Sequence, residues 1–255
     1  MDESREEKYK PTVGVYDADF LPYYICHNKK DEPEKTLEEC YTLVDNFIDN
    51  INQAIEAEFY CGFLTVGKCF RYTIYPDYKA NRKYEQKLNY LDRVKEYLIT
   101  KHNFTYLSGY EADDLVVSFK RQYVDFKSII VSPDKDILYS VDVAYNPRKN
   151  EFVHNYPEDI SKYFWTSMIT GDTTDNIKGI PGKGPAAAKS IYEFGKVIKH
   201  PKFLAGLALT NYIEHFGEVR GIEEFYKNFK CLNLVNTVVL DDVKLNKIEK
   251  IEFSE

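Results

Sequence analysis

The chain has few of the features that mark disulfide-bonded, zinc-binding or membrane-spanning proteins. Its five cysteines contain no pair separated by two residues, and an odd number does not suit a disulfide framework. No apolar stretch approaches the length of about 20 residues that a membrane-spanning helix needs. The charged first ten residues do not resemble a secretory signal. We therefore expect a cytoplasmic protein without membrane contact.

Positive charge is also scarce for a protein that binds nucleic acid. The 34 lysines and arginines are outnumbered by 41 acidic residues, which gives a net charge of −7. DNA-binding surfaces are normally basic, so this balance argues against a DNA partner. Bound divalent cations would remove the objection, because two of them offset roughly four negative charges. With 255 residues the chain can form one large domain with a smaller appendage.

Apolar runs and helical patterns alternate along the first two thirds of the chain. Buried or edge strands are expected at residues 12–16, 59–66, 69–75, 104–107 and 128–132, with a hairpin at 142–146 and 151–154. Helices are expected at residues 36–59, 84–101, 157–170, 202–215 and 221–230, with a short extended run at 235–240. This order predicts an α/β fold, with a mostly parallel sheet flanked by helices and a helical C-terminal part.

Acidic residues follow the expected strand ends or begin the helices behind them. In chain order they are Asp17, Glu111, Asp113, Asp114, Asp134, Asp136, Asp172 and Asp175. Because the carboxyl ends of parallel strands lie at one edge of a sheet, we expect these carboxylates to converge. Oxygen ligands without a matching set of bases favour Mg²⁺ or Mn²⁺. Two such ions can promote phosphodiester hydrolysis.

Residues 171–185 join two of these acids to a glycine-rich turn. Asp172 and Asp175 are three residues apart, so a helix or turn would point both carboxylates into one pocket. A helix beginning at Pro185 would place its positive N-terminal end just behind the turn. Backbone amides would be accessible to an anion at three glycines: Gly179, Gly182 and Gly184. The stretch therefore predicts a metal-type acidic pair beside a phosphate-binding turn.

Four motifs together resemble the structure-specific 5′ nucleases, the family of flap endonucleases and 5′→3′ exonucleases. The motifs are Tyr-Lys-Ala-Asn-Arg at 78–82, Glu-Ala-Asp-Asp at 111–114, Ser-Pro-Asp-Lys-Asp at 132–136, and Gly-Asp-Thr-Thr-Asp-Asn-Ile at 171–177 with the glycine turn behind it. They occur in the family's order and extend over roughly residues 12–190. The chain is most similar to the compact bacteriophage members, and a viral protein of this kind would act in the host cytoplasm.

The resemblance implies a PIN-like nuclease core over residues 1–170, with a short arch or gateway at about 76–108. A helix–three-turn–helix DNA-binding element and a helical region would follow over 171–255. The implied first metal cluster is Asp17, Glu111, Asp113 and Asp114, and the second is Asp134, Asp136, Asp172 and Asp175. Lys79 and Arg82 would contact the scissile phosphate. The implied DNA-binding residues are Tyr78, Gly179, Gly182, Lys183 and Gly184, with a monovalent cation such as K⁺ in the glycine turn.

The resemblance also implies a substrate and partners. The substrate would be DNA with a 5′ end, flap or nick, and the RNA strand of an RNA–DNA hybrid is an open alternative. The protein would act as a monomer, in replication or repair, alongside a polymerase. The sequence does not distinguish exonuclease from endonuclease action.

Two departures from the family pattern bear on these expectations. Residues 64–68 read Leu-Thr-Val-Gly-Lys, without the aspartate that the family carries at the end of the second strand, and Asp19 is an open alternative for it. The segment between Arg82 and Glu111 is shorter than a full arch, which favours an open gateway over threading of a flap. Two other functions remain open alternatives: a haloacid-dehalogenase-like phosphatase using Asp17 and Asp19, and a DNA-binding relative without activity.

Overall fold

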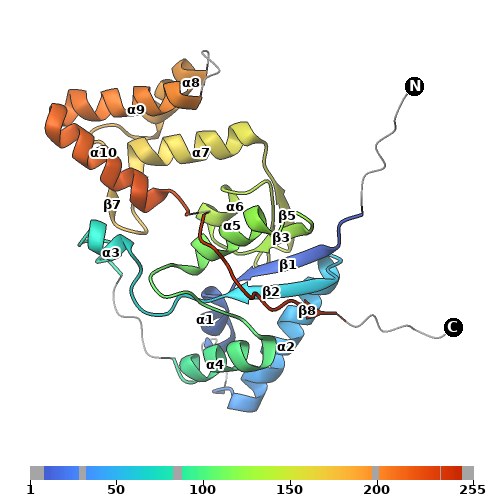
Figure 1. Ribbon diagram of the computed structural model, residues 1–255. Coiled ribbons are helices and arrows are strands. Elements are labelled where there is room, and N and C mark those ends of the chain that lie inside the picture. The colour runs from blue at the N-terminus through green and yellow to red at the C-terminus, as the bar shows by residue number, and fades with distance from the viewer. Residues whose placement is uncertain (1–8, 29–32, 83–87, 197–200, 236, 249–255) are drawn as a thin grey trace, which may run out of the picture.

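A six-stranded sheet forms the centre of the protein (Figure 1). The computed structural model describes residues 9–28, 33–82, 88–196, 201–235 and 237–248. The strand order is β5-β4-β3-β1-β2-β8. The strands are β1 (Thr12–Asp17), β2 (Phe59–Phe63), β3 (Lys127–Val131), β4 (Val143–Asn146), β5 (Glu151–His154) and β8 (Asn246–Lys247). Only the edge strands β5 and β8 pair antiparallel, so the mostly parallel α/β sheet expected from the sequence is confirmed.

Helices cover both faces of this sheet (Figure 1). One face packs against α1 (Phe20–Cys26), α2 (Leu37–Ala54) and α4 (Leu91–His102), and the other against α5 (Ala112–Gln122) and α6 (Lys135–Leu138). Side chains along a strand alternate between the faces, which is why Val15 and Tyr16 enter different core clusters. Strands buried on both faces need the continuous apolar runs that the sequence showed.

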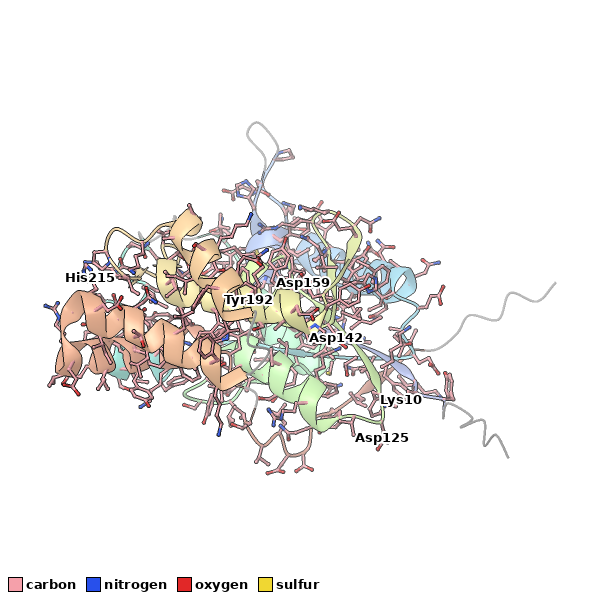
Figure 2. The ribbon with its side chains drawn as sticks, turned by 90° about the horizontal axis from the view of Figure 1, so that it is seen from above. Lys10, Asp125, Asp142, Asp159, Tyr192 and His215 are labelled. Atoms are coloured by element: carbon pink, nitrogen blue, oxygen red, sulfur yellow. The ribbon has the colours of Figure 1, made fainter. Side chains whose placement is uncertain are left out.

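A group of helices lies to one side of the sheet, in the upper left of Figure 1. It contains α7 (Pro157–Thr170), a small hairpin of β6 (Gly171–Asp172) and β7 (Ile177–Lys178), then α8 (Pro185–Lys196), α9 (Pro201–Phe216) and α10 (Glu218–Leu232). These helices share their own apolar cluster, which includes Met168, Ile180 and Tyr212. In the view from above, Tyr192 of α8 reaches α7, where its hydroxyl donates to the Glu158 carbonyl at 3.0 Å (Figure 2).

The strand expected at residues 69–75 is wrong, because a short helix, α3 (Arg71–Ile74), occupies this segment. Cys69, Tyr75 and Tyr78, which flank this helix, enter one cluster with Ile177 of β7 and Cys231 of α10. The segment is therefore held by packing against distant parts of the chain and not by pairing with a neighbouring strand. The free edge of β2 is instead paired by β8, which the sequence did not indicate.

Other boundaries differ in smaller ways. The helix expected at residues 36–59 ends at Ala54, since Glu56 adopts a left-handed φ of 52° and the chain turns into β2. The strand expected at 104–107 is reduced to a single bridge between Phe63 and Thr105. The first residues of the helix expected at 84–101 lie outside the described residues, and α4 begins at Leu91.

The extended run expected at 235–240 forms no strand in its described residues, which hydrogen-bond instead to side chains of α5. Within the described ranges, no helix combines the length and apolar character needed to cross a membrane.

Candidate active site

The first acidic group forms where β1 and β3 end side by side. β1 ends at Asp17, whose Oδ2 accepts a hydrogen bond of 2.8 Å from the Ser132 hydroxyl just beyond β3. Burial, together with the charges of Asp19 and Asp134, raises the pKa of Asp17 to about 7. Neighbouring parallel strands thus bring residues more than 100 positions apart into one charged cluster, as the sequence predicted.

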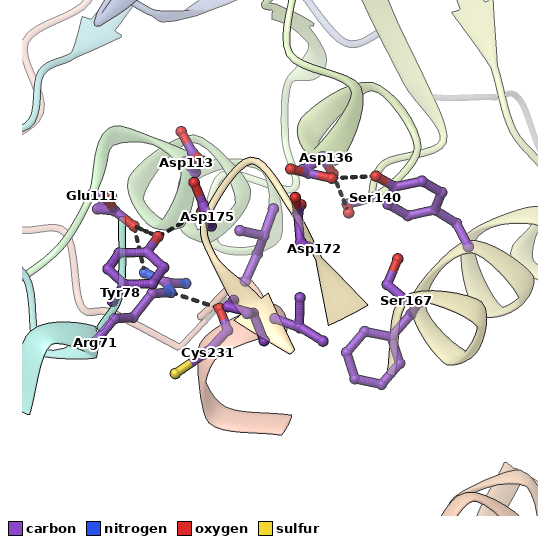
Figure 3. Close-up of a pocket in the computed structure, with 15 residues that line it drawn as sticks. Arg71, Tyr78, Glu111, Asp113, Asp136, Ser140, Ser167, Asp172, Asp175 and Cys231 are labelled. Carbon is purple, nitrogen blue, oxygen red and sulfur yellow. Dashed lines mark hydrogen bonds and ion pairs between the residues drawn. The ribbon is translucent and has the colours of Figure 1, made fainter. Parts of the chain in front are cut away.

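Asp113 joins this group from the first turn of α5. Burial raises the pKa of Asp113 well above its ordinary value, and the charges of Asp17, Glu111 and Asp134 raise it further. Within the described part of the chain, its carboxylate accepts no hydrogen bond and forms no ion pair. The side chain of Asp113 points into the pocket that Glu111, Asp136, Asp172 and Asp175 also line (Figure 3).

The second acidic group surrounds the start of α6. Asp134 caps this helix, and its Oδ1 accepts from the Asp136 amide at 2.8 Å. Burial raises the pKa of Asp136 to about 7; Asp134 and Asp172 add to this, although the hydroxyl of Tyr163 donates to it. Asp172 is buried too, but the Thr174 amide and Lys135 lower its pKa. The Lys135 Nζ lies 3.6 Å from Asp172 Oδ2.

A third group combines acids with the expected phosphate-binding bases. Lys79 forms an ion pair with Glu111, and its Nζ is 3.8 Å from Asp175 Oδ2. Arg82 donates to Asp175 Oδ1 at 2.7 Å. The Tyr78 hydroxyl lies 2.7 Å from Glu111 and 2.8 Å from Asp175, between the two carboxylates (Figure 3). Residues 78–82 therefore lie directly against the acids at the start of α5 and in the β6–β7 turn.

Asp114 stands apart from the other acids. It is fully buried, and its two oxygens lie 2.7 and 2.8 Å from the guanidinium of Arg71. Its Oδ1 also accepts from the Val235 amide at 2.8 Å. In this structure Asp114 is the anion of a buried ion pair, whereas the sequence led us to expect a metal ligand.

Asp19 reaches the strand end that lacks the family's aspartate. Its Oδ1 accepts from the Thr65 amide at 2.7 Å, and its Oδ2 accepts from the Thr65 hydroxyl. That hydroxyl in turn accepts from the Ala112 amide at 2.9 Å. A carboxylate from the end of β1 therefore lies against the chain just beyond β2.

The three glycines of the turn differ in the space around them: Gly182 and Gly184 have room for a side chain, and Gly179 does not. A side chain at Gly179 would collide with the backbone, since its Cβ would lie 2.2 Å from the Thr170 carbonyl carbon. Gly182 has a φ of 78° and follows Pro181 in a turn closed by the Lys183 amide on the Ile180 carbonyl at 3.0 Å. A Cβ at Gly182 or Gly184 would meet nothing within 4 Å. Lys183 donates to Asn211 Oδ1 at 2.6 Å.

The acids lie close enough to shift one another's pKa values, but their side chains do not yet have the spacing of metal ligands. Among the described residues, no three acidic, histidine or cysteine side chains already have metal-site spacing. The sequence did not indicate Arg71, Lys135 or Tyr163. One feature of the sequence could have drawn attention to Arg71, because it is the single charged residue among the apolar and aromatic residues 69–72. No feature of the sequence distinguishes Tyr163.

Comparison with known proteins identifies the family. The family described as "5'-3' exonuclease, N-terminal resolvase-like domain" matches residues 18–163. The chain belongs to this family. The match spans two of the acidic segments, 111–114 and 134–136, and favours the nuclease interpretation over the phosphatase alternative.

Relatives of this exonuclease-family chain occur as separate proteins and as parts of polymerases. It is 27% identical over 224 residues to a 5'-3' exonuclease of Mycoplasmopsis pulmonis, covering 82% of this chain and 73% of the relative. It is 30% identical over 218 residues to DNA polymerase I of Mycobacterium tuberculosis H37Rv, covering 75% of this chain. It spans only 24% of that polymerase.

Solved structures share the fold of this family member. The T5 5'-exonuclease with bound divalent metal ions (zinc) has a TM-score of 0.64 at 20% identity, covering 89% of this chain and 90% of that chain. The catalytic core of Rad2 in complex with DNA substrate has a TM-score of 0.52 at 17% identity, covering 91% and 75%.

The pKa values of the buried acids predict how the stability of the metal-free protein changes with pH. Asp17 has a pKa of about 7, against 3.8 for a free aspartate, so between these values the folded state holds a proton that the unfolded state has released. Its contribution to stability is therefore complete below about pH 4 and is lost as pH rises through 7. Asp17→Asn cannot lose stability in this way, because asparagine does not titrate. We therefore expect the thermal midpoint of the variant, relative to that of the wild type, to increase between pH 5 and pH 7.5 when both are measured in EDTA.

Asp142→Asn provides the matched control for this measurement. The pKa of Asp142 is lowered, because the ammonium of Lys120 outweighs the opposing effect of burial. Its stabilising contribution is present above pH 4, so the variant should be less stable than the wild type by the same amount at pH 5 and 7.5. A difference for Asp17→Asn that does not change over this range would contradict the prediction.

Proposed function

We propose that this chain is a divalent-metal-dependent 5′ nuclease, which hydrolyses phosphodiester bonds near the 5′ end of DNA. The observation that carries the proposal is the convergence of carboxylates from distant segments at the strand ends, beside Lys79 and Arg82. The family match and the relatives named as 5'-3' exonucleases support it. The pocket is also lined by Asp172, Asp175 and Ile177 of the β6–β7 hairpin, which leads into the glycine turn and α8.

The donor set fits Mg²⁺ or Mn²⁺. All its ligand atoms are carboxylate oxygens. Burial and the repulsion between neighbouring acids raise the pKa values of Asp17, Asp113 and Asp136, and divalent cations would offset both effects. Such ions, when bound, lower the pKa of water and stabilise charge on phosphate oxygens. We assign Asp17, Glu111 and Asp113 to the first site and Asp134, Asp136, Asp172 and Asp175 to the second. We leave out Asp114, because Arg71 engages both its oxygens.

The remaining residues of the pocket can hold and orient the substrate. We propose that Asp19 contributes the acid missing at the end of β2, since its carboxylate lies against Thr65. Lys79 and Arg82 would exchange their ion pairs with Glu111 and Asp175 for the scissile phosphate. Tyr78 would hold Glu111 and Asp175 in place through its hydroxyl.

The division of labour along the chain is also part of the proposal. We propose residues 1–170 as the nuclease core and 171–255 as the duplex-binding element with its helical region. The two parts interlock, because α7 packs on the helical group and β8 returns to the central sheet. Amides at Gly182 and Gly184, with Lys183, would bind backbone phosphates of the duplex, with K⁺ in the same turn. The polymerase I relatives suggest action in replication or repair alongside a polymerase.

The deciding experiment is a cleavage assay on the full chain with three 5′-labelled substrates: a flapped duplex, a nicked duplex and an RNA–DNA hybrid. We expect release of short 5′ products in Mg²⁺ or Mn²⁺, and none in EDTA. The ratio of flap cleavage to stepwise shortening measures endonuclease against exonuclease action. Binding to DNA without cleavage in either metal would identify the chain as an inactive relative.

Substitution of Gly182 by valine tests the glycine turn. Valine does not tolerate the φ of 78° at this position, and its side chain would project from the proposed phosphate-binding surface. We expect duplex affinity in EDTA to fall about tenfold, corresponding to roughly one charge-assisted hydrogen bond. Fluorescence anisotropy with a labelled nicked duplex measures the change.

Gly217→Val is the control for backbone strain. Gly217 has a φ of 83° and open space around its Cβ, but it lies between α9 and α10, away from the turn. Both variants should lose similar stability, whereas only Gly182→Val should lose affinity. Equal affinities would remove the turn from the DNA-binding surface.

A further inference from the structure

Arg71 is a buried side chain that contacts two distant parts of the chain, the start of α5 and the end of α10. It belongs to α3 and is only 1% exposed. Its Nε donates to the Cys231 carbonyl at 2.8 Å, at the end of α10 (Figure 3). Its Nη1 lies 2.7 Å from Asp114 and 3.1 Å from Glu111, at the start of α5. Its Nη2 adds Asp114 at 2.8 Å and the Asn233 carbonyl at 3.4 Å.

These contacts use the forked shape of the guanidinium. Burial would favour loss of its proton, but Asp114 and Glu111 more than offset this and hold the pKa of Arg71 above its ordinary value. A lysine has one ammonium group and cannot pair with Asp114 through two parallel bonds while also reaching two carbonyls. The charge is therefore fully paired, and the pairing has a defined geometry.

An apolar cluster next to Arg71 joins the segment around α3 to α10 and to β7. Cys69, Tyr75 and Tyr78 pack there against Ile177 of β7 and Cys231 of α10. The Asn228 side chain of α10 also donates to the Lys178 carbonyl at 2.7 Å. Arg71 is the charged centre of a joint between α10, the β6–β7 hairpin and the segment that leads to Lys79.

The joint connects two groups of residues with different roles in the proposed reaction: the helical group around α10, and the residues around Glu111 and Lys79. α10 packs on α7 and α9, so it is part of the helical group that carries the glycine turn. Glu111 lies on the other side and pairs with Lys79. If the glycine turn binds the duplex as proposed above, the orientation of the helical group relative to Glu111 and its neighbours sets which phosphodiester bond lies at the acidic pocket.

We propose that Arg71 is a positioning residue that fixes the helical group against the acidic pocket and so selects the bond that is cleaved. The proposal rests on the nuclease function proposed above. A role in stability alone would affect the amount of folded protein, whereas a positioning role affects where the products end.

The test uses Arg71→Lys in the full chain, with Mn²⁺ and a 5′-labelled nicked duplex, well below the unfolding temperature. We expect duplex affinity in EDTA to change by less than about twofold, because the DNA-binding surface is intact. The single-turnover rate should fall about 100-fold, as for a misplacement of roughly 1 Å. Product lengths should spread over neighbouring positions. Wild-type product lengths in Arg71→Lys would overturn the proposal.

Val44→Ala is the matched control. Val44 is fully buried in the cluster beneath α2, away from the joint, so its truncation lowers stability without touching Arg71. It should keep the wild-type product lengths. If this control spreads the products equally, Arg71 acts only through stability and the proposal fails.

Two further measurements keep the result interpretable. Should Arg71→Lys fail to fold, the double variant Arg71→Met/Asp114→Leu removes both buried charges, and its products should still spread. Hydrogen exchange at Val235, whose amide donates to Asp114, should speed up at least tenfold in Arg71→Lys, because the partner of that acceptor is displaced. Unchanged hydrogen exchange at Val235 would contradict the proposed role of Arg71, and this measurement does not depend on cleavage. Absence of cleavage by the wild type would separately refute the nuclease function.

Discussion

Replacing Asp113 by asparagine should lower cleavage of nicked DNA by about 1000-fold or more while leaving the fold intact. Metal ions supply several kcal/mol of transition-state stabilisation, and each 1.36 kcal/mol corresponds to tenfold in rate. The carboxylate of Asp113 accepts no hydrogen bond within the described residues, so its removal breaks no structural contact. Single-turnover rates in saturating Mn²⁺ measure the loss, and anisotropy in EDTA should show unchanged duplex affinity.

Two companion measurements make this result specific. Asp134→Asn should lose activity similarly and keep its helix cap, because the amide oxygen can still accept from the Asp136 amide. Without metal, Asp113→Asn should be more stable than the wild type at neutral pH, since burial and neighbouring acids raise the pKa of this carboxyl. Wild-type cleavage rates in Asp113→Asn would remove this residue from the proposed active site.

Replacing the adjacent Asp114 by asparagine should instead lower stability while largely preserving metal binding. The change removes the anion from a buried ion pair and leaves the Arg71 guanidinium without its main partner, at a cost of about 3–5 kcal/mol of unfolding free energy. Urea unfolding in EDTA measures this loss, with Asp113→Asn as the neighbouring control. Calorimetry on the folded fraction should show Mn²⁺ affinity within about tenfold of the wild type, because Asp114 binds no ion in our assignment. Full stability in Asp114→Asn would show that Arg71 has found another partner.

The sequence predicted those parts of the structure that depend on local periodicity. The apolar run at β3 and the helical spacing of α2 and α7 identify their elements within a few residues. The acids could be predicted to converge because strand ends in a parallel sheet meet at one edge, and Asp17, Asp113 and Asp134 do influence one another. No comparison tests their proposed metal ligation, which stays a prediction.

The features that the sequence missed depend on contacts between distant residues. Arg71 binds the Cys231 carbonyl 160 positions away, and no local pattern indicates such a partner. Asp113 and Asp114 are chemically alike in the sequence, and only the guanidinium beside Asp114 distinguishes their roles. β8 is too short for a periodic signal and forms only because β2 offers an unpaired edge.

The late position of several partners has a consequence during synthesis on the ribosome. The acids at the start of α5 are translated well before Cys231, Asn233 and Val235, which complete the surroundings of Arg71 and Asp114. β8, which covers the edge of β2, emerges later still. At a translation speed of about 5–20 residues per second, the nascent chain spends several seconds with Arg71 and Asp114 short of these partners. We therefore expect nuclease competence to arise only after α10 and the residues behind it have left the exit tunnel, so that an unfinished polypeptide does not cut the nucleic acids around it.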